Sequence, residues 1–460
     1  MDHPAGAEKH ADESYAPDHR ENPKFLEDQT GARAQPHDDK YLDPFGDEEH
    51  GEVKYRTMTW WHCGIVMIAE TIALGILSLP SVVARIGLVP SVILIVGLGI
   101  LATYTGYNLG QFKMRYPHVH SMADAGEVLL GPIGREIFGT AQLLFLVFIM
   151  GSHVLTFAVM MNTLTEHGTC SIVFNVVGMI VSFIFTIPRT LKNVSWLSVS
   201  SFISLLGALL ITMIAIGIQH PGKGTKATVD AEFYTAFGAV TNIVFAYAGH
   251  VAFFGFISEM EKPEDYPKAL YLLQVLDTIM YVIAAVVIYV YGGDNVASPA
   301  LSSTSPLIQK IAYGIAIPTI VIAGIINGHV ATKYIYIRVF RGSDVIHKRS
   351  LLSIGSWCLI AFALWVLAWI IAEAIPVFNN LLGLIVALFA SWFTYGLSGV
   401  FWLFLNKGRW FSSPSKIGLT IVNVIVVAIG AAICGLGLWS SGKAIHDNPL
   451  SASFSCASNA

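Results

Sequence analysis

The sequence predicts an all-α polytopic membrane protein with about eleven transmembrane helices. Of its 460 residues, 54% are hydrophobic and only 13% are charged, and the mean hydropathy is +0.61. Soluble proteins are about one-quarter charged, so composition alone favours the membrane class. Apolar segments long enough to cross a bilayer recur along the whole chain. We expect spans at 58–83, 87–111, 136–162, 170–188, 194–219, 233–258, 268–292, 312–339, 351–372, 377–405 and 416–440.

The first 56 residues differ in composition from everything that follows. They contain 15 Asp and Glu against 7 Lys and Arg, with few aromatic or β-branched residues. This composition is typical of a disordered segment, and no apolar core marks a signal peptide. We expect a disordered acidic tail at 1–56, whose lysines trafficking machinery could reach. A transmembrane domain at 57–440 and a short external tail at 441–460 would follow.

Short loops between the spans carry an unequal share of Lys and Arg. With the N-terminus in the cytoplasm, fourteen of these residues face inside and five, including Arg85, face outside. Because cytoplasmic loops are enriched in Lys and Arg, we predict a cytoplasmic N-terminus and an external or lumenal C-terminus.

Residue sets that are typical of enzymes are missing from the sequence. The five cysteines show no paired spacing, and no His-Glu-x-x-His run occurs. The run 217–224 has P-loop spacing but ends in Gly and follows a membrane span rather than a strand. We therefore expect no enzyme, metal, cofactor, disulfide framework or nucleic-acid partner.

The first span, 58–83, contains a carboxylate and two helix-weakening residues, Glu70, Gly75 and Pro80. Relative to Ala, a helix interior disfavours Gly by about 1 kcal/mol and Pro by about 3 kcal/mol. Backbone groups freed by a break must be buried in protein or line a polar cavity. We predict two half-helices joined by an unwound stretch around 73–76; a simple proline kink is the alternative.

The sixth span, 233–258, carries a second interruption, at Ala248-Gly249-His250. Interrupted spans at matching places in two repeats are the best sequence pointer to a transporter binding site. We therefore predict a 5+5 inverted repeat, with repeats at about 57–219 and 233–405 and an extra helix at about 416–440. Half-helix N-termini favour a carboxylate, and unwound carbonyls favour an ammonium group. A site offering both suits a zwitterion such as an amino acid.

Two stretches resemble the amino acid/auxin permease family: GILSLP at 75–80, followed by Gly87, and FAYAGHVAFFGFISEMEKPEDYPKAL at 245–270. TWWHCGIVMIAETIALGILSLP at 59–80, with ATKYIYIRVFRG at 331–342, is most similar to fungal neutral amino acid permeases of the methyltryptophan-resistance type. The resemblance runs from about Thr57 to Trp439 and leaves out the acidic tail.

The resemblance implies the fold of the amino acid–polyamine–organocation superfamily. It also implies proton-coupled import of neutral aliphatic and aromatic L-amino acids at the plasma membrane, by alternating access in the lipid bilayer. A sensor of the same fold and a vacuolar exporter remain alternatives. Glu70-Thr71 departs from many relatives, which have a small or amide residue there, and so favours protons over sodium. The substrate-binding positions that the resemblance implies are Thr71, Ile72, Ala73, Leu74, Gly75, Phe245, Tyr247, Ala248 and Gly249.

Ionisable residues at membrane depth cost about 2.5–3.5 kcal/mol on insertion scales and are functional candidates by default. Glu70 is the strongest proton-coupling candidate; a hydrogen-bonded structural carboxyl is the alternative. Lys333 could instead extend its stem to the interface. Glu259 and Glu261, which close the sixth span, form loop ion pairs or an inner gate. The full set of proton-coupling candidates is Glu70, His250, Asp277 and Lys333, with His153 and His329 as interior histidines.

Overall fold

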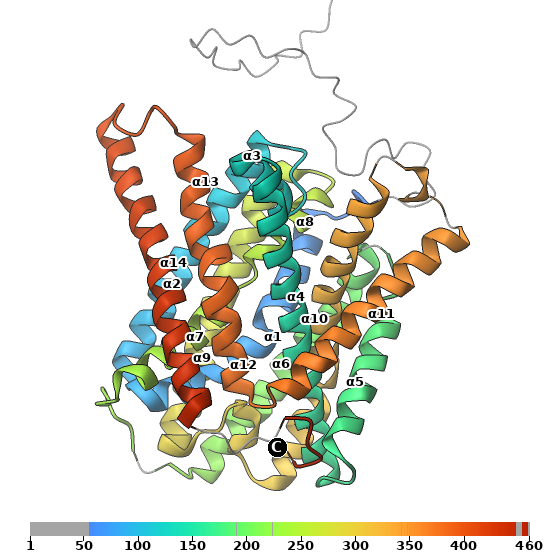
Figure 1. Cartoon of the computed structure of the whole chain (residues 1–460). Coiled ribbons are helices and arrows are strands. Elements are labelled where there is room, and N and C mark those ends of the chain that lie inside the picture. The colour runs from blue at the N-terminus through green and yellow to red at the C-terminus, as the bar shows by residue number, and fades with distance from the viewer. Residues whose placement is uncertain are drawn as a thin grey trace, which may run out of the picture. The chain divides into compact units, whose positions relative to one another are not determined.

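The computed structural model describes residues 55–189, 191–222, 224–341, 343–346, 348, 350–447 and 453–458. The expectations about the acidic tail therefore lie outside the described residues, apart from positions 55 and 56. The described part of the transmembrane region is a bundle of helices (Figure 1).

The first repeat contains five spans and one short helix. Its helices are α1 (Trp60–Ile86), α2 (Leu88–Arg115), α3 (Met122–Leu130), α4 (Pro132–Thr165), α5 (Ser171–Thr186) and α6 (Leu191–Gln219). The short helix α3 was not predicted, because it is too brief to span a membrane. A capping box starts it: Ser121 accepts a hydrogen bond from the Asp124 N–H, and the Asp124 carboxylate accepts from the Ser121 N–H.

The second repeat contains the other five spans, followed by the extra helix. Its helices are α7 (Phe233–Ala246), α8 (His250–Ser258), α9 (Tyr266–Gly292), α10 (Pro306–Phe340), α11 (Leu351–Ala374), α12 (Phe378–Ile385), a π-helical stretch (Val386–Gly396), α13 (Leu397–Leu405) and α14 (Pro414–Asp447). Short 3₁₀ turns lie at Pro263–Asp265, Gly293–Asn295, Ala300–Ser303 and Asp344–Ile346.

Apolar surface on the outer helices shows that this is an integral membrane protein. Among the described residues, nine helices are long and apolar enough to cross a membrane, the bent α1 makes a tenth, and α5 is a shorter apolar helix. The apolar part of α14 is only 28% buried, whereas that of Phe233–Ser258 is 94% buried. Such exposed apolar area needs lipid to cover it. The interrupted sixth span therefore lies in the interior, and α2, α11 and α14 face the bilayer.

The interruption of the first span takes the form of a bend. The halves Trp60–Ile72 and Leu74–Ile86 meet at 46°, but α1 stays helical throughout, so the unwound stretch expected at 73–76 is not present. A Cβ added to Gly75 would lie 2.5 Å from the Ala246 Cα atom, so glycine permits a close approach of α1 to α7 here. Pro80 is accommodated inside the helix.

The break in the sixth span is confirmed. α7 ends at Ala246, α8 begins at His250, and three non-helical residues separate them. The Tyr281 hydroxyl of α9 donates to the Ala246 carbonyl at 2.6 Å, which satisfies one of the carbonyls that the break frees. The broken backbone is thus supported by protein, away from lipid.

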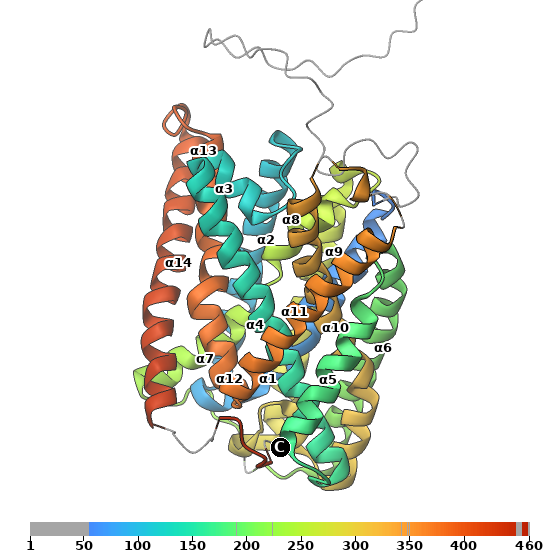
Figure 2. The same ribbon diagram turned by 45° about the vertical axis from the view of Figure 1, so that its right-hand side comes forward.

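The expectation of no disulfide was wrong, because Cys170 and Cys456 are bonded. They are 286 residues apart, and only the fold brings the C-terminal segment beside the start of α5. Backbone contacts hold the same segment, since the Phe454 N–H donates to the Glu373 carbonyl at 3.1 Å. Figures 1 and 2 show this segment at the end of the bundle opposite α3 and the α13–α14 loop.

Candidate functional site

A small cavity lies where the α7–α8 break faces α1 and α4. Its volume is about 20 Å³, enough for one water molecule, so the site is closed in this structure. Five of its lining residues come from predicted substrate positions, one is the predicted proton-coupling carboxyl, and two come from α4. They are Thr71, Leu74, Phe245, Ala248, Gly249, Glu70, Ile149 and His153.

Glu70 occupies the part of this cavity nearest to the break. The Thr71 hydroxyl donates to its Oε2 atom at 3.0 Å, and Asn327 of α10 also faces the carboxyl. A Cβ added to Gly249 would lie 2.7 Å from Glu70 Oε2 and 2.5 Å from Thr71 Oγ1. Glycine at 249 therefore allows the carboxyl to reach the start of α8, where the helix dipole favours negative charge.

Asp277 is a second buried carboxyl near Glu70, on α9. Neither of its oxygens has a hydrogen-bond partner among the described residues, and the same is true of the Gln274 amide one turn earlier. Tyr281, one turn later, supports the break through Ala246. A buried carboxylate without partners is costly, so a proton or a cation would stabilise this position.

Lys333 of α10 is buried and forms an ion pair with Glu259 at the end of α8. It does not extend to the interface. Its ammonium also lies 5.0 Å from the centre of the Tyr55 ring. Next to this pair, the Met58 N–H donates to the Glu259 carbonyl at 3.0 Å, and the Glu261 N–H donates to the Met58 carbonyl at 2.8 Å. The start of α1, the end of α8 and α10 are thereby joined at one end of the bundle.

The other predicted site residues lie outside the cavity lining. Ile72 is buried in the core, and Gly75 packs against Ala246. The Tyr247 hydroxyl donates to the Ile95 carbonyl of α2 at 3.0 Å. His250 also faces α2, with Nε2 2.9 Å from the Ala102 carbonyl and 3.1 Å from the Thr105 hydroxyl. The side chain of Ala73 lies outside the described part of the chain.

Sequence reasoning missed two lining residues, both on α4. His153 was visible as an ionisable residue at membrane depth, and its Nδ1 atom lies 2.8 Å from the Ile320 carbonyl. Ile149 carried no signal, because one apolar residue of a long apolar span resembles any other. It lies one turn before His153 on the same helix face.

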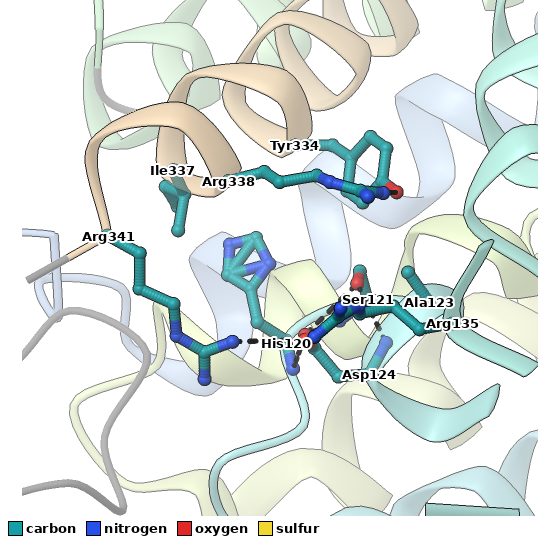
Figure 3. A pocket seen from close by; sticks show the side chains of 9 residues that line it. All are labelled: His120, Ser121, Ala123, Asp124, Arg135, Tyr334, Ile337, Arg338 and Arg341. Atoms are coloured by element: carbon teal, nitrogen blue, oxygen red, sulfur yellow. Dashed lines mark hydrogen bonds and ion pairs between the residues drawn. The ribbon is translucent and has the colours of Figure 1, made fainter. Parts of the chain in front are cut away.

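A larger cavity of about 230 Å³ lies among α3, α4 and α10, and Figure 3 shows its three arginines. Each arginine has an acidic partner: Arg338 with Glu136 at 2.6 Å, Arg135 with Glu127 at 3.0 Å, and Arg341 with Asp124 at 3.6 Å. Burial lowers the pKa of His120, on the same wall, to about 3, so this histidine is neutral. Because the charges balance, this cluster holds α3 and α4 to α10 rather than forming a site for an ion.

An interrupted, buried helix with a carboxyl beside the break is the arrangement expected of a transporter binding site. Two solved structures share the fold. One is MHP1, a nucleobase-cation-symport-1 family transporter in a closed conformation with bromovinylhydantoin bound (TM-score 0.57, 13% identity, 88% of this chain and 97% of that chain). The other is MhsT in complex with L-phenylalanine (TM-score 0.53, 14% identity, 85% of this chain and 100% of that chain). At these identities the likeness concerns the fold alone.

The family is shown by sequence. A model described as transmembrane amino acid transporter protein matches residues 56–442. The N amino acid transport system protein of Neurospora crassa is 36% identical over 431 residues, which cover 90% of this chain and 92% of that protein. The chain belongs to the transmembrane amino acid transporter family. The resemblance seen at 59–80 and 245–270 is therefore confirmed. The general function of this family, amino acid transport, applies to this chain.

Proposed function

We propose that this protein imports neutral aliphatic and aromatic L-amino acids across the plasma membrane by proton symport. The observation that carries the proposal is the approach of the Glu70 carboxyl to Gly249, in the break between α7 and α8. A carboxyl enclosed there can hold a proton in one conformation and release it in another. Sodium coupling is the less favoured alternative.

The closed cavity suits an amino acid with an uncharged side chain. Leu74, Ile149, Phe245 and Ala248 offer apolar surface, which would contact an aliphatic or aromatic side chain. The start of α8, directly after Gly249, offers the partial positive charge of a helix N-terminus to the substrate carboxylate. Ile72 and Gly75 would support these positions by packing.

Two buried carboxyls, Glu70 and Asp277, are the proposed proton-carrying groups. Asp277 has no partner among the described residues, which favours a protonated form that must change charge or environment during the cycle. We assign His250 to positioning, since the two contacts of its Nε2 atom with Thr105 and Ala102 fix α8 against α2. Lys333 acts through Glu259, at the end of the bundle where α1 begins.

Opening toward the α1 N-terminal end requires the contacts around Glu259 and Met58 to separate. That end is proposed to face the cytoplasm, as the loop charges favour. The disulfide between Cys170 and Cys456 supports the same orientation, because disulfides persist in oxidising compartments and this one lies at the opposite end. The substrate would thus enter from the disulfide side.

The proposal is tested by reconstituting the full chain in liposomes with a panel of labelled amino acids, with and without an inward proton gradient. We expect gradient-driven accumulation of neutral amino acids. Glu70→Gln should abolish accumulation yet retain exchange of labelled for unlabelled substrate, because exchange needs no net proton movement. Glu166→Gln is the control, since Glu166 is an exposed carboxyl paired with Lys310.

Two outcomes would contradict the proposal. Uptake by the wild type that ignores the gradient would exclude proton coupling. Full accumulation by Glu70→Gln would leave proton coupling in place but remove Glu70 from it.

A further inference from the structure

Another polar cavity, of about 270 Å³, lies at the C-terminal end of α1. Among the described lining residues, Arg85 of α1 contributes the one charged side chain, and amides, hydroxyls and glycines supply most of the rest. The lining residues of α7, α12 and α14 are Tyr234, Thr235, Gly238, Thr241, Asn242, Asn379, Asn380, Gly383, Ser440, Ser441 and Ala444. We call it the Arg85 cavity.

Arg85 has no acidic partner among the described residues. The acidic residues closest in sequence to the lining, Glu232 and Asp447, do not line the cavity. Lys443, in contrast, adds positive charge nearby, with its ammonium 4.0 Å from the centre of the Tyr234 ring. A half-buried guanidinium is always charged and offers five donors in a planar fork that matches a carboxylate.

A cation in the last turn of a helix also stabilises the helix dipole, which explains the charge at position 85. It does not explain the wall opposite. Asn379 there accepts from the Ser298 hydroxyl at 2.9 Å, and its Oδ1 atom lies 3.5 Å from the Asn242 amide nitrogen. In the described part of the chain, neither Asn380 nor Arg85 has a side-chain hydrogen-bond partner, and both line this polar cavity.

The Arg85 cavity lies on the same helix faces as the central cavity. On α1, positions 74, 78, 81 and 85 follow the three- and four-residue spacing of one face, from Leu74 in the central cavity to Arg85. Eleven residues separate the two, so they lie about 16 Å apart along the axis. On α7, Thr241 and Asn242 lie one turn before Phe245, which lines the central cavity.

We propose that the Arg85 cavity is a second binding site for the amino acid, in which Arg85 holds the α-carboxylate before the substrate reaches the central cavity. This inference rests on the proposed function and its orientation. The volume is close to the lower limit for ligand pockets, about 300 Å³, as suits a small solute. The buried hydroxyls of Ser78 and Ser81 lie on the α1 face between the two sites.

The test measures binding apart from transport. The probe is 3-phenylpropanoate, which has the carboxylate of L-phenylalanine but no amino group, added to the purified full chain while thermal stability is followed. We expect a concentration-dependent rise in Tm, with the apparent affinity at least about tenfold weaker in Arg85→Gln, because a charge-assisted pair is lost. Lys226→Gln is the matched control, since Lys226 is a cation at the same end of the bundle as Arg85 and is paired with Asp294 at 2.6 Å. The affinity of Lys226→Gln for 3-phenylpropanoate should equal that of the wild type.

Arg85→Lys keeps the charge but loses the fork, so its affinity should fall between those of the wild type and Arg85→Gln. If Arg85→Gln does not fold, the affinity of Arg85→Lys for 3-phenylpropanoate tests the proposal. An affinity equal to that of the wild type in Arg85→Lys, or in a folded Arg85→Gln, would overturn the proposal. So would an equal, Arg85-dependent rise in Tm with chloride in place of 3-phenylpropanoate, which would assign the cavity to inorganic anions.

The same variants separate this inference from the proposed function. In liposomes, Arg85→Gln should raise the KM for labelled L-phenylalanine by about tenfold. Wild-type protein that transports nothing but binds 3-phenylpropanoate through Arg85 would refute the proposed function and leave the carboxylate site standing. Wild-type transport with an unchanged KM in Arg85→Gln would refute the site and leave the function standing.

Discussion

Lys333 and Glu259 form a buried ion pair that joins α10 to the end of α8, the second half of the broken sixth span. Their side chains are only 3% and 1% exposed. Met58, at the start of α1, adds backbone hydrogen bonds to the same place. The pair lies at the end of the bundle where α1 begins. The inner-gate interpretation of Glu259 therefore has a candidate partner in Lys333.

Breaking this pair should destabilise the closed end. Lys333→Ala leaves the Glu259 carboxylate buried without its cation, a loss of about 3–5 kcal/mol for a buried pair. We expect alkylation of Cys63, which is buried on α1 in this structure, to become faster. The measurement is maleimide labelling of a variant in which Cys358 and Cys434 are replaced by Ser. Lys268→Ala removes an exposed cation paired with Asp265 and should change nothing; equal labelling in both variants would exclude a gate.

Gly249→Ala should abolish transport while the protein still reaches the membrane. The added Cβ would collide with Thr71 Oγ1 and Glu70 Oε2 at the break, at 2.5 and 2.7 Å. The matched control is Gly255→Ala, six residues further along, where the nearest atom is the His120 carbonyl oxygen at 4.0 Å. Uptake rates per copy of protein provide the measurement. Normal transport by Gly249→Ala would show that the close approach of Glu70 to the break is not needed.

Asp277→Asn should keep the fold and lose coupling. Asp277 has no hydrogen-bond partner within the described ranges. Removing its carboxyl should therefore leave stability unchanged or raise it, because no buried charge then needs compensation. Accumulation driven by a proton gradient should fall, whereas exchange should persist. Thermal unfolding checks the stability of the variant, and the accumulation and exchange assays, run on the same preparation, check its proton coupling. A drop in Tm together with normal accumulation would assign Asp277 a structural role.

Replacing Cys456 by Ser should destabilise the start of α5, where Cys170 lies. Loss of a disulfide typically costs about 2–4 kcal/mol. Cys434→Ser, which removes a free thiol on α14, is the control. The measurement is Tm with and without reductant. The wild type should respond to reductant, and Cys456→Ser should not; a wild-type Tm that is indifferent to reductant would contradict a bonded pair.

Most of the membrane topology was predictable, because hydropathy is a local property. All the predicted spans coincide with helices or interrupted helices, and the break at 247–249 was visible from Ala248, Gly249 and His250. The first interruption was predicted in place but not in form. Whether a Gly and a Pro unwind a helix or bend it depends on what packs against it, and Ala246 of α7 packs against Gly75.

The candidate site was predictable only in part. The sequence pointed to Glu70 and to the α7–α8 break, since charge and helix breakers are unusual at membrane depth. It could not show that Tyr247 and His250 turn toward α2, or that Ile149 completes the cavity. Side-chain direction beside a break depends on the neighbouring helices.

The sequence by itself determined that this protein lies in a membrane, where its helices run and where one of them breaks. These properties follow from runs of apolar residues and from the backbone limits of Gly and Pro. The tertiary structure alone decided that Lys333 meets Glu259, 74 residues away, that Cys170 meets Cys456, 286 residues away, and that Arg85 faces a polar cavity. Contacts over such separations depend on how whole helices pack, which no local pattern records.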